Sequence, residues 1–84
     1  MKITRLTRNQ LKLLLEIYDK GEVTSATQKT YWRYAFYLNI SSLNDAGLVI
    51  QKGVNKNNQK VWTLTPVGRE VVRHLKAIEE ALGG

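Results

Sequence analysis

The stretch that decides the fold runs from Leu43 to Glu70 and reads LNDAGLVIQKGVNKNNQKVWTLTPVGRE. Its first part stops an apolar helical repeat at Ala46-Gly47, because glycine readily takes the left-handed conformation that ends a helix. The apolar period then changes to two, with Leu48, Ile50 and Lys52 at alternate positions. This alternation predicts a strand.

The second part of the stretch predicts a return strand and a further helix. Residues 61–64 are rich in β-branched and aromatic side chains, and the polar link 53–59 before them is of hairpin type. Thr65 is a helix N-cap residue, and Pro66 follows at the first helical position, where its missing N–H costs nothing. We therefore expect a β-hairpin joined directly to a C-terminal helix.

An N-terminal helix is expected over residues 8–20. Thr7 and Gln10 have the spacing of a capping box, with Leu6 and Leu11 at the two staple positions. The helix is expected to end at Gly21. The face predicted to pack in the core consists of Leu11, Leu14, Leu15 and Tyr18.

The middle of the chain predicts a short strand, a short helix and a long helix. Val23 and Thr24 are expected to make a brief extended pairing, and residues 25–29 a brief helix. The long helix is expected over residues 31–46, and the side chains predicted to face the core are Trp32, Phe36, Asn39, Ile40 and Leu43. The opposite face carries Arg33, Tyr34, Tyr37, Leu38 and Ser41. Its tyrosines either form a contact surface or pack against a neighbouring element.

The C-terminal helix, residues 66–82, carries an apolar stripe. The stripe consists of Val71, Leu75, Ile78 and Leu82, at spacings of four, three and four. We expect this stripe to pair with a second copy of the chain, giving a homodimer. The alternative is that it covers the N-terminal helix of the same chain.

Composition limits the classes of protein. With 84 residues, of which 43% are hydrophobic, the chain is expected to form one compact domain over residues 1–84. It has no cysteine and one histidine, His74, so we expect no disulfide, no metal and no cofactor. The acidic residues show no acid–base pairing, which argues against an enzyme, and nothing indicates a small-molecule ligand. The absence of a long apolar run predicts no membrane span and a cytoplasmic location.

Charge gives the first indication of a partner. The formal net charge is +6, and residues 23–66 hold five basic residues against a single acid, Asp45. A basic excess concentrated in one segment favours an anionic partner such as nucleic acid.

Two segments, LNDAGLV at 43–49 and WTLTPVGRE at 62–70, make the chain resemble winged helix-turn-helix domains of MarR-like and PadR-like prokaryotic transcriptional regulators. The first looks like the exit of their recognition helix into the wing, and the second like the join from the wing to the next helix. The resemblance implies a mainly α fold with a β-hairpin wing (α+β), in the order helix, short strand, helix, helix, hairpin, helix. It also implies a transcriptional regulator that binds double-stranded DNA.

On this hypothesis, helix 31–46 enters the major groove and the wing, residues 48–64, lies along the backbone. The residues expected to contact DNA from the helix and the segment before it are Lys29, Thr30, Arg33, Tyr34, Tyr37 and Ser41. Those expected from the wing are Lys52, Asn55, Lys56, Asn57, Asn58 and Lys60. If about five cations neutralise phosphates, log K should fall with log salt at a slope of about −4 to −5 per protomer.

Two other functions use the same residues. A protein-interaction module would present Tyr31, Tyr34, Tyr37 and Leu38 as an apolar patch. A non-specific nucleic-acid coating or architectural protein would use the cations without a sequence preference.

Overall fold

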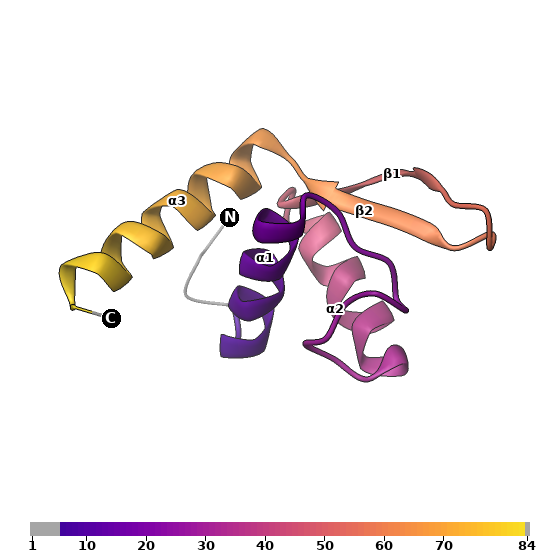
Figure 1. Ribbon diagram of the computed structural model, residues 1–84, viewed down its shortest axis with the longest axis horizontal. Coiled ribbons are helices and arrows are strands. Elements are labelled where there is room, and N and C mark those ends of the chain that lie inside the picture. Colours follow the sequence, from indigo (N-terminus) through magenta and orange to yellow (C-terminus); the bar gives the residue numbers. More distant parts are fainter. Residues whose placement is uncertain (1–5, 84) are drawn as a thin grey trace.

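The computed structural model describes residues 6–83 (Figure 1). The described chain forms α1 (Arg8–Lys20), α2 (Arg33–Asp45), β1 (Val49–Val54), β2 (Lys60–Leu64) and α3 (Pro66–Ala81). The strands pair as one antiparallel hairpin, so the expected α+β class with a hairpin is confirmed. The molecule measures 40 × 24 × 23 Å, and the hairpin and the C-terminal end of α3 lie at opposite ends of the long axis. No helix in this described range has the length and apolar character needed to cross a membrane.

The local signals for α1 are confirmed. The Thr7 hydroxyl accepts from the backbone N–H of Gln10, whose side chain accepts in return from the Thr7 N–H, and Gly21 ends the helix at φ 87°. The predicted core face is partly wrong. Leu13, Leu14 and Ile17 are the buried residues of α1, together with Gln10, whereas Tyr18 is 37% exposed and Leu11 and Leu15 pack only in part against the core. The predicted face and the buried face both have helical spacing and share Leu14. In the folded chain the face that includes Leu13 and Ile17 packs in the core.

The segment between α1 and α2, residues 21–32, is called the connecting loop below. The expected pairing of Val23 is confirmed, because it exchanges two backbone hydrogen bonds with Trp62, of 2.9 and 2.8 Å. The brief helix expected at 25–29 is wrong, since residues 25–27 form a turn. The Thr24 side chain accepts from the N–H groups of Ala26 and Thr27, and such local side-chain bonds compete with continued helix formation. The element order therefore differs from the expected one.

Helix α2 begins at Arg33 rather than at residue 31. Phe36, Ile40 and Leu43 are buried as predicted, but Trp32 is 88% exposed, so its predicted place in the core is wrong. The reason is its backbone: Trp32 is the N-cap, with extended angles of φ −60° and ψ 152°, and the helical projection does not apply to it.

A compact joint connects α2, the hairpin and α3. Gly47 has φ 81°, which favours glycine, and the chain then enters β1. The Thr65 hydroxyl donates to the Gly47 carbonyl (2.6 Å) and accepts from the N–H of Gly68 (3.0 Å), while the Thr65 N–H donates to the Leu48 carbonyl (3.0 Å). At Gly68, a side-chain methyl would overlap the Leu48 carbonyl oxygen. The two sequence segments that predicted the hairpin and the last helix thus contact each other.

Helix α3 packs on the body through its first half. Val71 and Val72 are buried in the core, Leu75 packs partly against it, and Lys76 pairs with Asp19 of α1 at 3.1 Å. The prediction that Val71 lies in a dimer interface is not supported, because its side chain is 7% exposed inside the monomer. Ile78 and the C-cap residue Leu82 are 56% and 81% exposed. The C-terminal end of α3 extends away from α1 (Figure 1).

Candidate functional site

The outward face of α2 carries a row of exposed residues. Tyr34, Tyr37, Leu38 and Ser41 follow the helical spacing i, i+3, i+4, i+7 and are all exposed, with Tyr34 at 78%. They lie opposite the buried residues Phe36, Ile40 and Leu43. Arg33, which the sequence also places on this face, has a side chain outside the described part of the structure. Tyr34 is thus largely free of neighbouring elements in the monomer, whereas Tyr37 is half exposed and contacts the connecting loop.

Tyr37 is held in place at one edge of this row. Its hydroxyl donates to Ser25 Oγ of the connecting loop at 3.2 Å, and its ring meets Phe36 edge to face at 5.9 Å. Half of the side chain remains exposed. Tyr37 therefore presents a fixed aromatic edge, whereas Tyr34 projects into solvent.

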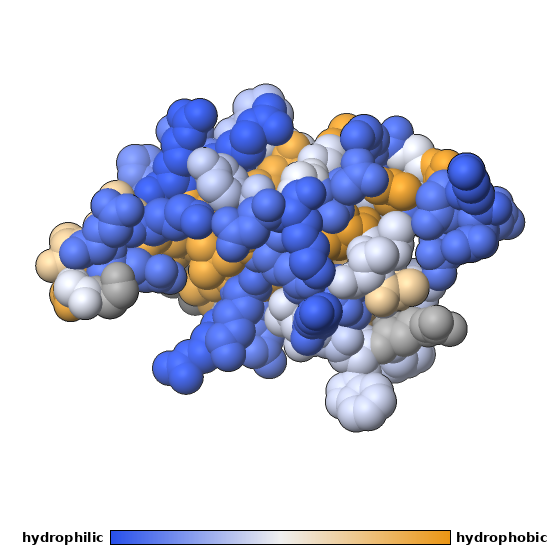
Figure 2. All heavy atoms as spheres, viewed as in Figure 1, coloured by the Kyte–Doolittle hydropathy of each residue, from blue (hydrophilic) through white to orange (hydrophobic). Residues whose placement is uncertain are grey.

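The hairpin lies against this part of α2. A surface hollow is lined by residues of the connecting loop, α2 and the hairpin: Ser25, Phe36, Tyr37, Asn58, Gln59, Lys60 and Trp62. Tyr37 of the outward row on α2 and residues 58–60 of the hairpin thus border the same hollow. Figure 2 shows that the hairpin tip, at the right of the view, is hydrophilic.

Asn55 organises the hairpin tip. Its Oδ1 accepts from the N–H groups of Asn57 and Gln59, at 2.9 and 3.0 Å, and its Nδ2 donates to the side chain of Gln59 at 3.1 Å. Asn58 takes the left-handed conformation with φ 61°, which asparagine tolerates better than most residues. Asn55 therefore holds the turn, and Lys56, Asn57 and Asn58 are the exposed residues that the turn presents.

The predicted cations differ in their surroundings. Lys52 is the extra residue of a β-bulge, and its ammonium pairs with Glu22 at 2.6 Å. The ion pairs found among the described side chains include none of Lys29, Lys56 and Lys60. These three lysines are all exposed, so their charge is available to a partner.

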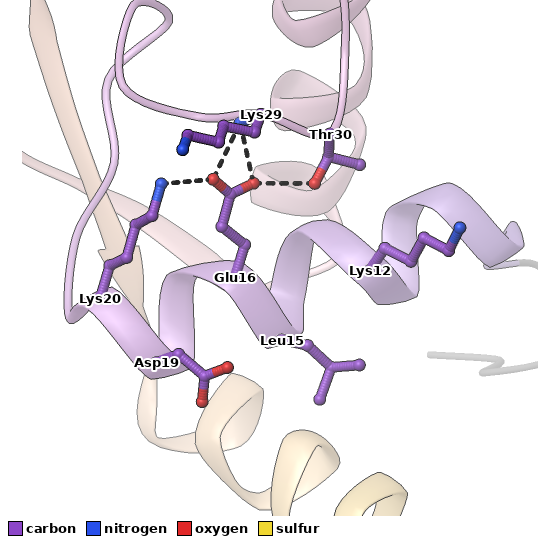
Figure 3. A pocket seen from close by; sticks show the side chains of 7 residues that line it. All are labelled: Lys12, Leu15, Glu16, Asp19, Lys20, Lys29 and Thr30. Carbon is purple, nitrogen blue, oxygen red and sulfur yellow. Dashed lines mark hydrogen bonds and ion pairs between the residues drawn. The ribbon is translucent and has the colours of Figure 1, made fainter.

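Glu16 of α1 fastens the connecting loop (Figure 3). Its carboxylate accepts from the Lys20 ammonium (2.7 Å), from the backbone N–H of Lys29 (2.8 and 3.1 Å) and from the Thr30 hydroxyl (2.8 Å). Burial raises the pKa of Glu16, but the hydrogen bonds from these donors outweigh it, so the pKa lies below its ordinary value. The Lys29 N–H and the Thr30 hydroxyl are therefore not free for a phosphate, contrary to the prediction, and only the Lys29 ammonium remains for one.

A second hollow lies beside Trp32, and sequence reasoning missed it. It is lined by Ser25, Gln28, Lys29, Thr30, Tyr31 and Trp32. Ser25 also lines the hollow between the hairpin and α2. Gln28 shapes it, because its side chain donates to the Tyr31 carbonyl (2.6 Å) and accepts from the Tyr31 N–H (2.8 Å). Tyr31 itself packs partly against the core and contributes little to an outward patch.

A scan against models of known protein families found no match, and a search of curated proteins found none either.

Proposed function

We propose that the protein is a sequence-specific, double-stranded DNA-binding transcriptional regulator with a winged helix-turn-helix type of fold. The observation that carries this proposal is the continuous surface of α2 and the hairpin, which is exposed, rich in hydroxyl and amide groups, and flanked by unpaired lysines. In this arrangement α2 lies in the major groove and the hairpin follows the sugar–phosphate backbone.

The dimensions of α2 suit this role. Its 13 residues span about 20 Å, and an α-helix fits the major groove, which is about 12 Å wide. Tyr34 and Tyr37 offer hydroxyls for phosphates and rings for thymine methyl groups, while Ser41 allows close approach of the helix. Arg33 at the start of the helix would bind a guanine edge or a phosphate.

The helix start also suits an anion. Thr7 and Thr65 cap α1 and α3 with their side chains, whereas α2 has no side-chain cap. The first N–H groups of a helix lack intrahelical acceptors and favour negative charge. Together with the Lys29 ammonium, this end of α2 would take a backbone phosphate.

The hairpin supplies the remaining contacts. Lys56 and Lys60, with the side chains of Asn57 and Asn58, are suited to phosphate or minor-groove contact. Lys52 is already neutralised by Glu22, so four cations remain: Lys29, Arg33, Lys56 and Lys60. With about −0.9 per contact, the expected slope of log K against log salt is about −3 to −4 per protomer, rather than the −4 to −5 per protomer expected for five cations.

Binding to pools of random duplexes, repeated across salt concentrations, tests the proposal. Enrichment of a palindromic site with the slope given above is the expected result. Equal binding to all sequences with a steep slope would instead favour non-specific coating. Absence of binding at low salt would refute DNA binding and favour the protein-interaction module.

The exposed end of α3 supports a dimer. Leu75 is half-buried, but Ile78 and Leu82 project into solvent, and Figure 2 shows hydrophobic surface along α3. The end of a helix without packing is marginally stable in water, so a partner for this stripe would stabilise it. A two-fold dimer would bind paired half-sites about one turn of DNA apart.

The protein-interaction module is the second candidate, because Leu38 is 61% exposed next to Tyr34. Apolar exposure at helical spacing is typical of protein contact surfaces. The lysines of the hairpin beside this patch favour DNA over it.

A further inference from the structure

Within the described residues, the side chain of Trp32 makes no contact that explains why a tryptophan stands at this position. It is the N-cap of α2, its side chain makes no capping hydrogen bond, and the residue is 88% exposed. Serine, threonine, aspartate or asparagine would satisfy the helix start better, as the threonines before α1 and α3 do. The indole is therefore both a poor cap and a large apolar surface left in water, which indicates a contact with a partner.

The surroundings of Trp32 suit a nucleobase. The hollow beside it has a volume of about 290 Å³ and is lined by hydroxyl, amide and aromatic side chains together with Lys29. None of its lining residues is acidic, and the carboxylate of the neighbouring Glu16 is turned toward Lys20 and the Lys29 N–H. A polar, positively charged hollow with an aromatic wall provides what an unstacked base needs: a π-face for stacking and a cation for the adjoining phosphate.

The hollow is also continuous with the surface proposed to bind DNA. Ser25 lines both this hollow and the one below the hairpin, and the Tyr37 hydroxyl donates to the same residue. A base held beside Trp32 would therefore belong to the same DNA molecule that lies along α2 and the hairpin.

We propose that the hollow beside Trp32 is a base-stacking site, in which the indole stacks on a DNA base that has left the helical stack at the edge of the bound site. This inference rests on the proposed DNA-binding function and deepens it. A stacking site gives the protein a preference for DNA in which one base is unpaired or easily unstacked, because binding such DNA requires less free energy for unstacking than binding a fully paired duplex. An aromatic residue of a protein partner is the rival occupant, and the acid-free lining with Lys29 favours the base.

The test compares two labelled duplexes that differ only by one unpaired base, measured by fluorescence anisotropy with the wild type, Trp32→Phe and Trp32→Ser. The wild type is expected to prefer the duplex with the unpaired base. Trp32→Ser is expected to lose roughly 5- to 150-fold in affinity for that duplex and with it the preference, the range that follows from loss of one base–aromatic stack. Trp32→Phe keeps a ring and should keep most of the preference.

Two further measurements separate stacking from damage to the fold. Trp32→Ser supplies a capping hydroxyl, so its melting temperature should equal or exceed that of the wild type. The second tryptophan, Trp62, packs against the core and is present in both the wild type and Trp32→Phe. The difference between their emission spectra therefore isolates Trp32, and stacking on the unpaired base should quench it.

The outcomes distinguish this inference from the function on which it rests. If the wild type binds both duplexes equally and Trp32 emission does not change, the stacking site is refuted and DNA binding stands. If Trp32→Phe loses as much as Trp32→Ser, the contact is not aromatic stacking and the inference is also overturned. If the wild type binds neither duplex at low salt, the proposed function itself fails.

Discussion

Gly68 lies in the first turn of α3, where this helix contacts the backbone of Leu48 just before β1. A methyl group added there would overlap the carbonyl oxygen of Leu48 and lie 3.1 Å from its carbonyl carbon and 3.3 Å from Leu64 Cδ2. Two of these atoms are backbone and cannot rotate away. Replacement by alanine, which normally favours a helix, is therefore expected to destabilise this one.

The magnitude follows from the bonds of the joint. If α3 moves to relieve the overlap, loss of the Thr65 cap lowers the free energy of unfolding by about 1 kcal/mol. Loss of the hydrogen bonds from Thr65 to Leu48 and Gly47 lowers it by about 1 kcal/mol each. If α3 stays in place, overpacking costs about 1–3 kcal/mol instead. Alanine returns up to about 1 kcal/mol through its helix propensity. The net loss is about 2 kcal/mol, or about 8–16 °C in melting temperature for a domain of this size.

Thermal and urea unfolding of Gly68→Ala measure this loss, and two other glycines provide matched controls. Gly53 has open space around it and no positive φ, so Gly53→Ala should change stability by less than about 0.5 kcal/mol. Gly47 also has open space but φ 81°, so Gly47→Ala should cost about 1–2 kcal/mol from backbone strain alone. A Gly68→Ala protein that melts within two or so degrees of the wild type would refute the close approach of α3 to Leu48.

Three further predictions concern charge and assembly. Glu16→Gln is expected to lower the free energy of unfolding by about 1–3 kcal/mol, since bonds to a charged acceptor are stronger than bonds to an amide; urea denaturation at neutral pH measures it. The pKa of Glu16 is lower in the folded state than its ordinary value of 4.5, so the ionised carboxylate stabilises the fold fully above pH 4.5. This stabilisation is lost as the pH falls through the folded-state pKa. The stability difference between the wild type and Glu16→Gln should therefore disappear on acidification through the folded-state pKa. Arg33→Ala should weaken binding to an enriched site by about 1–3 kcal/mol and relax one base position, whereas Lys56→Ala should weaken all sequences alike; equal losses on specific and random duplexes for both variants would contradict these roles. Ile78→Glu should convert a dimer to a monomer in sedimentation, while Ala77→Glu, which places a glutamate about 100° around α3 from Ile78 and outside the apolar stripe, leaves it intact; a monomeric wild type would refute the dimer.

Signals carried by a few neighbouring residues predicted the structure best. The capping box at Thr7, the glycine end of α1 at Gly21 and the Thr65-Pro66 start of α3 are all confirmed, because each depends on bonds within one turn of chain. The hairpin is also confirmed, since its turn is specified by asparagines that bond their own backbone.

The errors lie where two local solutions compete. In α1 the stripe that contains Leu13 and the one that contains Leu15 both have helical spacing, and only the position of α2 and α3 decides between them. The connecting loop contains residues that can start a helix, but Thr24 and Gln28 bond nearby backbone groups instead. The helical projection puts Trp32 on the core face only because it extends the helix to residue 31, whereas the backbone at Trp32 is extended and α2 begins at Arg33.

Residues 43–49 and 62–70, on which the resemblance to winged helix-turn-helix regulators rests, have a structural role in this fold. Gly47 and Leu48 from the first segment bond Thr65 from the second, and Gly68 packs on Leu48, so both segments serve one structural joint. None of these residues lies on the exposed face of α2 or at the hairpin tip. The resemblance therefore concerns how the hairpin is mounted between two helices. The surface that we propose to bind DNA consists instead of residues 25–41 and 55–60, which lie outside the joint. Substitutions in the joint should lower stability first, whereas substitutions at Trp32, Tyr34 or Lys56 should alter binding in a protein that still folds.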